Sequence, residues 1–219
     1  MADLFFLIVV DFDIIEPEGE VPYKVGLDLQ MECWKEVQEG GKSKVIFLEH
    51  SPTITLGRRT KQSHLFHTID EYREMGIEVV KVDRGGSVTY HGPGQLVGYI
   101  ITKVSKHGGT HNLVTKTMAL LEKAIHDLGI QCRKNNEFPG IWTETKPMKK
   151  LAAIGMQIKS GVSLHGFAVN VDLDLEPFTK ILPCGLPEPV STLSIELGRK
   201  VRVQETKDKI SMLLPDFLF

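Results

Sequence analysis

One short segment of the chain carries an unusual density of chemically useful side chains. It runs from Arg84 to Gln95 and reads RGGSVTYHGPGQ. Glycine lets a backbone approach a ligand closely or adopt positive φ, and the arginine, hydroxyl, imidazole and amide groups between the glycines can form hydrogen bonds. No Gly-Lys-Ser/Thr ending of a Walker loop is present, and no helix follows as in a dinucleotide fingerprint. From composition alone, a substrate-binding loop and an ordinary glycine-rich hairpin loop are equally acceptable.

The three cysteines are candidates for nucleophilic chemistry. Their odd number and wide spacing disfavour a disulfide framework or a zinc site and favour a reducing compartment. Cys33 falls on the apolar face of an expected helix, and no motif surrounds Cys132. Cys184 lies between Pro183 and Gly185, which suggests a shaped, accessible turn. On residue types alone, a small buried residue remains the commoner interpretation of such a cysteine.

The bulk composition indicates a soluble globular protein. The chain has 219 residues, 42% of them hydrophobic and 25% charged, and its formal net charge is −2. This balance disfavours nonspecific nucleic-acid binding, although a local basic patch facing an acidic protein partner remains compatible with it. The apolar segment Leu4–Val10 is too short to cross a bilayer, which takes about 20 residues. It also lacks a preceding positive region, so we expect a buried strand of a cytoplasmic protein with no membrane association.

The first half of the chain predicts short strands and two helices. A helix is expected to begin at Pro22 and to end at the glycine pair 40–41, with apolar residues every four positions at Val25, Leu29, Cys33 and Val37. Thr68 and Glu71 form a capping-box pattern for a short helix that stops at Gly76. Strands are expected at Val45–Glu49, Thr53–Leu56, Val79–Val82 and Leu96–Val104.

The second half predicts one long helix, a series of strands and a helical tail. The helix ends at Gly129, and its buried face consists of Leu113, Thr117, Leu120, Leu121, Ala124, Ile125 and Leu128. The strands are expected at Ile130–Lys134, Ile141–Thr143, Leu151–Ile158 and Gly166–Val171, and the tail helix at Gln204–Leu214 with Pro215 after it. Regular βαβα alternation is missing, so the fold class is α+β with a mixed or antiparallel sheet and flanking helices. We expect one domain over residues 1–219, in which residues 191–219 could form a small C-terminal subdomain.

The segment Arg84–Gln95 resembles the signature of lipoyl(octanoyl) transferases, the LipB family. Further segments match patterns of that family in the same order, and the resemblance covers roughly residues 48–193. These segments are Leu48–Pro52 with Thr55–Arg58, Lys150–Gly155, His165–Asn170 and Pro183–Gly185. One departure is small: the family has a Val-Thr-Ser-type triplet after its cysteine, where this chain has Val190-Ser191-Thr192. The resemblance implies a fold like the catalytic domains of biotin and lipoate protein ligases.

The resemblance also implies the catalytic pair and the reaction. It assigns Cys184 as the nucleophile and Lys150 as its partner, chosen over Lys146 and Lys149 because it adjoins the Leu-Ala-Ala-Ile-Gly sequence. A thiolate is a strong nucleophile and its thioester stays reactive toward amines. A desolvated lysine releases its proton readily, so the neutral amine of Lys150 could take the proton of Cys184 and the ammonium could then stabilise the thiolate.

The overall reaction expected from the resemblance is the first step of protein lipoylation. An octanoyl group on the phosphopantetheine of acyl carrier protein passes to Cys184 and then to a lysine of a lipoyl domain. The acceptors are the lipoyl domains of 2-oxoacid dehydrogenase complexes and the glycine cleavage H protein. Because the donor is already a thioester, no ATP, metal or other cofactor is expected. The residues expected to bind substrate are Arg84, Gly85, Gly86, Ser87, Val88, Thr89, Tyr90, His91, Ala153, Ile154, Gly155, Gly166, Phe167 and Ala168.

Three other activities remain open at this point. An ATP-dependent lipoate or biotin ligase would share the fold but would need no nucleophilic cysteine, so an ATP requirement separates it from a transferase. An acyl-binding or scaffold protein would keep the pocket without turnover. A cysteine hydrolase using Cys184 with His91 would release free octanoate. His165 is expected to be structural, because a lone histidine without metal-ligand spacing usually is.

Overall fold

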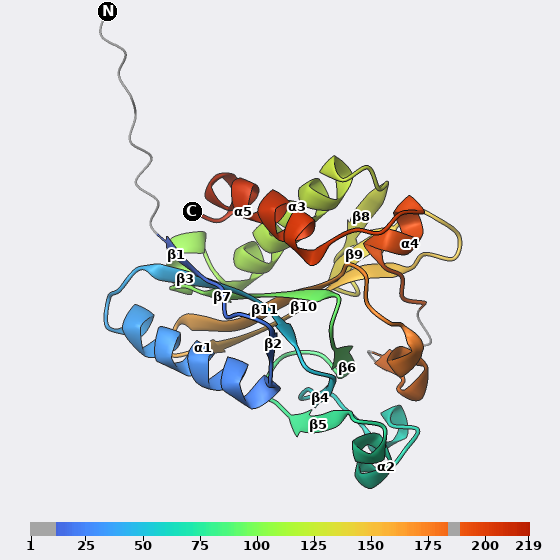
Figure 1. Ribbon diagram of the computed structural model, residues 1–219. Helices are drawn as coiled ribbons and strands as arrows, with labels where there is room; N and C mark the ends of the chain where they lie inside the picture. The colour runs from blue at the N-terminus through green and yellow to red at the C-terminus, as the bar shows by residue number, and fades with distance from the viewer. Residues whose placement is uncertain (1–11, 184–188) are drawn as a thin grey trace, which may run out of the picture.

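The computed structural model describes residues 12–183 and 189–219, so the expected first strand at Leu4–Val10 and Cys184 itself lie outside the described residues. Within that part of the chain, an eight-stranded mixed sheet has helices on both faces, and a three-stranded sheet lies beside it (Figure 1). This arrangement confirms the predicted α+β class.

The larger sheet positions most of the residues of interest. Its strand order is β1-β3-β7-β11-β10-β9-β8, and β2 also pairs with β3. β1 and β2 run parallel to β3, and the other neighbours are antiparallel. The strands are β1 (Phe12–Ile15), β2 (Glu20–Val21), β3 (Ser43–His50), β7 (Gln95–Ile101), β8 (Cys132–Asn135), β9 (Gly140–Thr143), β10 (Lys150–Lys159) and β11 (Val162–Asn170).

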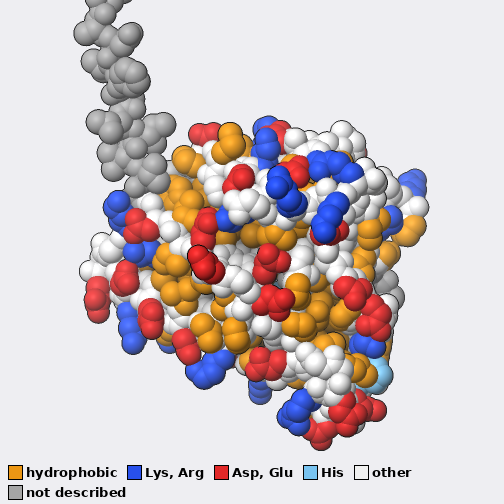
Figure 2. Space-filling view, in the orientation of Figure 1, with side chains coloured by type: hydrophobic (Ala, Val, Ile, Leu, Met, Phe, Trp, Pro, Cys, Tyr) orange, Lys and Arg blue, Asp and Glu red, His pale blue; other side chains and the backbone are white. Residues whose placement is uncertain are grey.

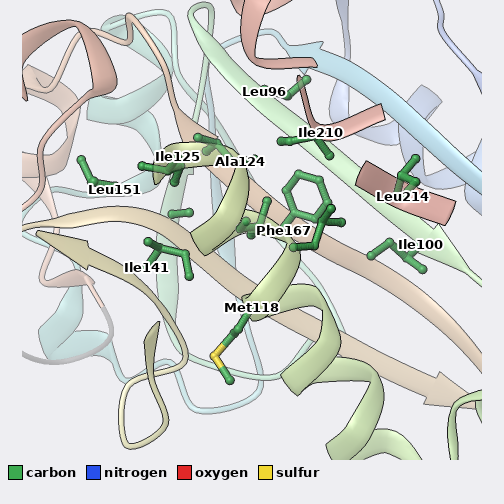
Figure 3. Close-up of a cluster of buried hydrophobic side chains, with 14 of the residues drawn as sticks. Leu96, Ile100, Met118, Ala124, Ile125, Ile141, Leu151, Phe167, Ile210 and Leu214 are labelled. Atoms are coloured by element: carbon green, nitrogen blue, oxygen red, sulfur yellow. The ribbon is translucent and has the colours of Figure 1, made fainter. Parts of the chain in front are cut away.

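The two faces of this sheet are covered differently. α3 (Thr110–Asp127) and α5 (Val203–Phe217) pack together on one face, where the main core includes Leu121, Phe167 and Ile210 (Figures 1 and 3). α1 (Tyr23–Gln38) covers part of the other face and packs against β3, β7 and β11. Phe167 and Val169 of β11 pack on the side of α3 and α5, and Val162 and Leu164 pack on the side of α1. The C-terminal half of the α1 side of this strand is thus available for a site.

The predicted helix after Pro22 is confirmed; of its predicted apolar positions, Cys33 and Val37 are buried and Leu29 is partly buried, but Val25 is not. Val25 is 54% exposed, whereas Val37 is 1% exposed. A residue every fourth position rotates about 40° per step around a helix of 3.6 residues per turn, so Val25 and Val37 lie about 120° apart. The buried residues are instead spaced alternately by three and four, which keeps them on one face. They are Tyr23, Gly26, Gln30, Cys33 and Val37.

The smaller sheet carries the glycine-rich segment. It consists of β5 (Glu78–Lys81), β4 (Thr53–Leu56) and β6 (Val88–His91), in that order. β6 was not predicted, because four residues flanked by glycines resemble a loop; its backbone is nevertheless paired with β4 along its whole length. α2 (Ile69–Glu74) begins with the predicted capping box between Thr68 and Glu71.

The C-terminal segment packs on the same core as the large sheet. Leu193 of α4 (Leu193–Leu197), Val201, Ile210 and Leu214 are all buried in the cluster that contains β7 and β11 side chains. α5 continues through Pro215 to Phe217, so the predicted end at that proline is wrong. Short 3-10 helices complete the described chain at Gln62–His64, Val104–His107 and Glu176–Lys180. In residues 12–183 and 189–219, no helix has the length and apolar character that crossing a bilayer demands.

Two valines of α1 provide a matched test of this packing. Val37→Ala should lower the free energy of unfolding by about 1–2 kcal/mol, because it removes buried methyl groups and regains only part of the loss through the better helix propensity of alanine. Val25→Ala should change it by less than about 0.5 kcal/mol. Urea denaturation of both variants measures the difference. Equal losses would mean that the helix faces the sheet with the residues expected from the four-residue repeat.

Candidate active site

The floor of the site is a stretch of small side chains on β10 and β11. Ala153 pairs with Ala168, and Gly155 pairs with Gly166, so these residues share one face of the two strands. Gly166 also lies so close to β7 that a Cβ there would meet the carbonyl oxygen of Gly98 at 2.1 Å. Large side chains are therefore absent from this face, where they would fill the space above the strands.

The roof of the site is the loop that follows Arg84, and the arginine itself holds it in place. Arg84 is buried, and its guanidinium donates to the hydroxyl and the carbonyl of Thr55 at 2.7 and 3.0 Å and to the carbonyl of Gly85 at 3.0 Å. The amide of Gly85 donates to the carbonyl of Met156 at 3.3 Å. The loop is thus tied to β4 on one side and to β10 on the other.

A pocket lies between this floor and this roof. Lys150 lines it together with every residue predicted to bind substrate except Tyr90. Tyr23, Val97, Tyr99, Pro139 and His165 complete the wall. The predicted residues at the pocket are Arg84, Gly85, Gly86, Ser87, Val88, Thr89, His91, Ala153, Ile154, Gly155, Gly166, Phe167 and Ala168.

Two of the predicted substrate-binding residues have their rings elsewhere. Tyr90 packs against Phe178, with ring centroids 5.7 Å apart, in the core under the small sheet. Burial raises the pKa of its hydroxyl to about 12. The ring of Phe167 belongs to the main core on the opposite face of β11 (Figure 3), although the residue also borders the pocket.

Lys150 begins β10 and is a cation of this pocket, as is Arg84. It is 7% exposed, and its Nζ lies 4.4 Å from the ring centroid of Trp142. Its amide donates to the carbonyl of Pro189 at 2.9 Å, and its carbonyl accepts from the amide of Ser191 at 3.0 Å. Pro183 borders a small neighbouring pocket that Lys150 also lines. Of the two residues that flank segment 184–188, Pro189 is thus hydrogen-bonded to Lys150, and Pro183 shares a pocket with it.

A directed chain of hydrogen bonds supports the backbone of Lys150. Gln95 Nε2 donates to the carbonyl of Tyr90 at 3.3 Å and to Asn170 Oδ1 at 2.9 Å. Asn170 Nδ2 donates to the carbonyl of Ser191 at 3.1 Å, next to the bond from Ser191 to Lys150. Because a carbonyl can only accept, the orientations of both amides are fixed. Gln95 and Asn170 belong to the sequence motifs but were not predicted as site residues. The available signal was a polar residue at the end of an apolar strand.

The same chain fixes the tautomer of His91. The remaining oxygen of Gln95 faces His91 Nδ1 at 2.7 Å, so that nitrogen carries the proton and Nε2 is the acceptor. Burial is the main cause that lowers the pKa of His91 to about 3, and the nearby His50 and Arg84 add to it. The imidazole is therefore neutral near pH 7.

His91 belongs to a cluster of neutral histidines and tyrosines at one end of the pocket. Burial also lowers the pKa of His50 and of His165 to about 4. His50 donates through Nδ1 to the carbonyl of Val21 at 2.8 Å and accepts through Nε2 from the hydroxyl of Tyr99 at 2.5 Å. His165 has φ of +60°, and its amide donates to Gln30 Oε1 at 2.8 Å. His91 and His50 are thus uncharged hydrogen-bonding groups, whereas Nδ1 of His165 is buried without a hydrogen-bond partner.

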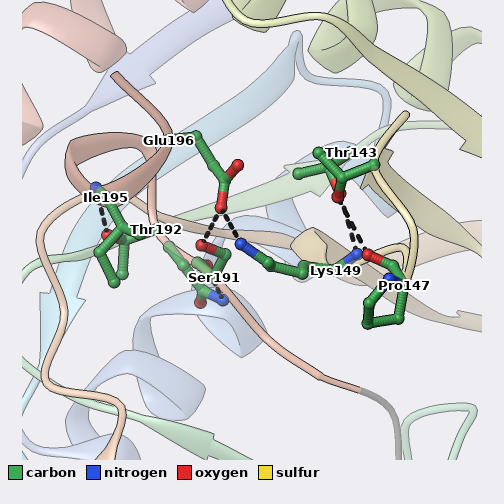
Figure 4. A network of polar contacts seen from close by, with 9 residues as sticks. Thr143, Pro147, Lys149, Ser191, Thr192, Ile195 and Glu196 are labelled. Atoms are coloured by element: carbon green, nitrogen blue, oxygen red, sulfur yellow. Dashed lines mark hydrogen bonds and ion pairs between the residues drawn. The ribbon is translucent and has the colours of Figure 1, made fainter. Parts of the chain in front are cut away.

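A second network, of hydrogen bonds and an ion pair, holds the backbone at residues 191 and 192. Glu196 Oε1 accepts from the hydroxyl of Ser191 at 2.5 Å and from Lys149 Nζ at 3.0 Å (Figure 4). Thr192 caps α4 by accepting from the amide of Ile195 at 3.1 Å (Figure 4). Among residues 12–183 and 189–219, no group of three or more His, Cys, Asp or Glu side chains is arranged to hold a metal ion.

Solved structures share this fold. A lipoate-protein ligase A bound with ATP aligns over 95% of this chain and 85% of its own, with a TM-score of 0.77 at 17% identity. A putative lipoate protein ligase from T. acidophilum with bound lipoic acid aligns over 94% of this chain and 85% of its own, with a TM-score of 0.72 at 16% identity. At such identities the likeness concerns the fold, which is that of the ligase catalytic domains expected from the sequence.

Sequence relatives are much closer. The octanoyltransferase of Dictyoglomus thermophilum is 39% identical over 208 residues, which cover 94% of this chain and 85% of the relative. The octanoyltransferase of Mycobacterium tuberculosis is 39% identical over 194 residues, which cover 88% of this chain and 81% of the relative. Residues 22–213 match the family described as the lipoyl protein ligase A/B catalytic domain. The chain therefore belongs to the lipoyl protein ligase A/B catalytic-domain family, groups with its octanoyltransferases, and is an acyltransferase.

Proposed function

We propose that this protein transfers an octanoyl group from octanoyl-acyl carrier protein to a specific lysine of a lipoyl domain through a thioester on Cys184. The observation that carries the proposal is the position of Lys150. It is buried at a pocket with a small-residue floor, it is hydrogen-bonded to Pro189, and it shares a neighbouring pocket with Pro183. These two prolines flank the segment that contains Cys184. The similarity to octanoyltransferases supports the choice of acyl group.

The pocket suits a linear acyl chain. Alanine and glycine residues on β10 and β11 leave a slot. Each methylene group of a ligand that is buried in it contributes about 0.8 kcal/mol to the binding free energy. The loop 84–89 lines the slot on the side opposite to these strands. Glycine-rich backbone at the roof could also supply amides for the oxyanion of a tetrahedral intermediate.

The proposed reaction has two acyl transfers. In the first, the amine of Lys150 takes the proton of the Cys184 thiol, and the thiolate attacks the carbonyl carbon of the donor thioester. The phosphopantetheine sulfur leaves with that proton, and the octanoyl group stays on Cys184. In the second, the neutral amine of the acceptor lysine attacks this thioester and gives one proton to Lys150, the Cys184 sulfur leaves and takes up that proton, and an amide forms. Neither transfer consumes ATP.

A cysteine–histidine pair is a weaker alternative for the same residues. A Cys–His dyad needs an imidazole that takes up the thiol proton, but the pKa of His91 is lowered to about 3, chiefly by burial. We therefore assign the base role to Lys150.

The proposed acceptors are lipoyl domains of 2-oxoacid dehydrogenase complexes and the glycine cleavage H protein.

The thioester intermediate can be tested by intact-protein mass spectrometry. After mixing with octanoyl-acyl carrier protein without ATP, the protein should gain one octanoyl group that hydroxylamine removes, and a lipoyl domain should then discharge it. Cys184→Ser should gain no hydroxylamine-labile group, whereas Cys33→Ser should behave like the unchanged protein. If acylation of the domain instead requires octanoate and ATP, the protein is a ligase and the role of Cys184 is wrong.

The role of Lys150 can be tested by comparing two lysine substitutions. Lys150→Met should slow thioester formation by about 10²–10⁴-fold, the usual contribution of a general acid–base group. Lys146→Met changes an exposed lysine of the same region and should leave the rate within about twofold of the original. Rapid-quench mass spectrometry measures both rates. Similar rates for the two variants would remove Lys150 from the mechanism.

A further inference from the structure

A groove on the outer surface opens directly beside the acyl pocket. It encloses about 510 Å³, and it shares Lys150 and the roof residues Gly85–Ser87 with that pocket. Its remaining wall comes from Arg59 and Lys61, from the start of α3 and from residues 137–139. The groove thus leads from Lys150 to two exposed cations.

These cations are held at the groove by their backbone. The amide of Arg59 donates to the carbonyl of Gly86 at 3.0 Å, and the amide of the neighbouring Arg58 donates to the carbonyl of Arg84 at 3.3 Å. The amide of Lys61 donates to His64 Nδ1 at 3.3 Å, and the same nitrogen lies 2.6 Å from Ser87 Oγ. The segment is therefore fastened to the roof loop, and its side chains project from a fixed position.

The local charge at the groove is positive. In residues 12–183 and 189–219, the recorded ion pairs involve neither Arg59 nor Lys61, and Glu137 is the one acid among the residues that line the groove. The molecule as a whole has a formal charge of −2, and the face shown in Figure 2 mixes side chains of both signs. The excess of cations at the groove is thus a local feature that favours an anionic occupant.

We propose that this groove binds the phosphopantetheine arm of the acyl carrier protein, with Arg59 and Lys61 at its phosphate. This proposal rests on the proposed function, because that function requires a thioester at Lys150 on a long arm. The arm carries a phosphodiester at one end and the acyl thioester at the other. A groove with cations at its outer end and Lys150 at its inner end matches that distribution of charge. Arginine and lysine are the side chains that bind phosphate oxygens most strongly.

The test combines charge reversal with a donor that has no phosphate. Arg59→Glu with Lys61→Glu should raise the concentration of octanoyl-acyl carrier protein at half-maximal thioester formation by about tenfold, as expected for two exposed charge contacts. The rate at saturation should stay within about twofold. Octanoyl-N-acetylcysteamine carries the same thioester without the phosphate, so its reaction should be unaffected. Raising the salt concentration should weaken donor binding in the original protein more than in the variant.

The matched control reverses one arginine and one lysine elsewhere. Arg73→Glu with Lys24→Glu gives the same net charge on exposed positions of α2 and α1, and it should leave the half-maximal donor concentration unchanged. Arg59→Gln with Lys61→Gln provides a milder variant should the charge reversal impair folding. It should raise the half-maximal concentration of octanoyl-acyl carrier protein by about threefold. Circular dichroism checks that each variant is folded.

The outcomes separate this proposal from the proposed function. An equal increase of the half-maximal donor concentration in the groove variant and in the control would overturn the groove proposal. A loss of reaction with the phosphate-free donor as large as that with the carrier protein would also overturn it. An effect with octanoyl-coenzyme A but not with the carrier protein would assign the groove to a free nucleotide thioester and would also overturn it. If the original protein forms no Cys184 thioester with any donor, the proposed function fails instead.

Discussion

Alternation of side chains along β10 and β11 is the constraint on which the rest of the site depends. One face of these strands presents Ile154, Phe167 and Val169 to the main core beneath α3 and α5. The other face presents only alanine and glycine at the paired positions that form the pocket floor. The same short stretch of sheet therefore provides hydrophobic stabilisation on one side and empty space on the other. A shift of one residue in register would exchange the two faces and destroy both functions.

The polar side chains around that space are held by hydrogen bonds that fix their orientation. Backbone carbonyls of Tyr90 and Ser191 set the direction of the Gln95 and Asn170 amides, and these in turn set the proton on His91. The chain ends at the backbone of Lys150, so the base proposed for the reaction is positioned through its peptide groups rather than through its flexible side chain. A network that is satisfied throughout in this way rigidifies a site.

Much of the fold could be predicted from local signals. The capping box at Thr68 and the apolar face of α3 depend on neighbours within four residues, and both were predicted correctly. The buried face of α1 was predicted only in part: Cys33 and Val37 are buried as predicted, but Tyr23 and Gln30 were missed. These two residues are buried by contacts with Tyr99, His91 and His165, which are distant in sequence. β6 was missed for a similar reason: its pairing with β4 outweighs the loop-forming tendency of its glycine neighbours. The motifs located the pocket, but Tyr90 shows that membership of a motif does not place a side chain in it.

The groove and the acyl pocket meet at Lys150, and this limits the order in which the donor and acceptor proteins can bind. On the proposed chemistry, the donor and the acceptor lysine must both reach the thioester beside this one residue. Two folded proteins cannot occupy that position together, so the first must depart before the second arrives. A covalent acyl-enzyme makes such a sequence workable, since it stores the acyl group between the two visits. The deacylated carrier protein and the acceptor domain then compete for the same surface, which makes the rate of transfer sensitive to the ratio of the two in solution.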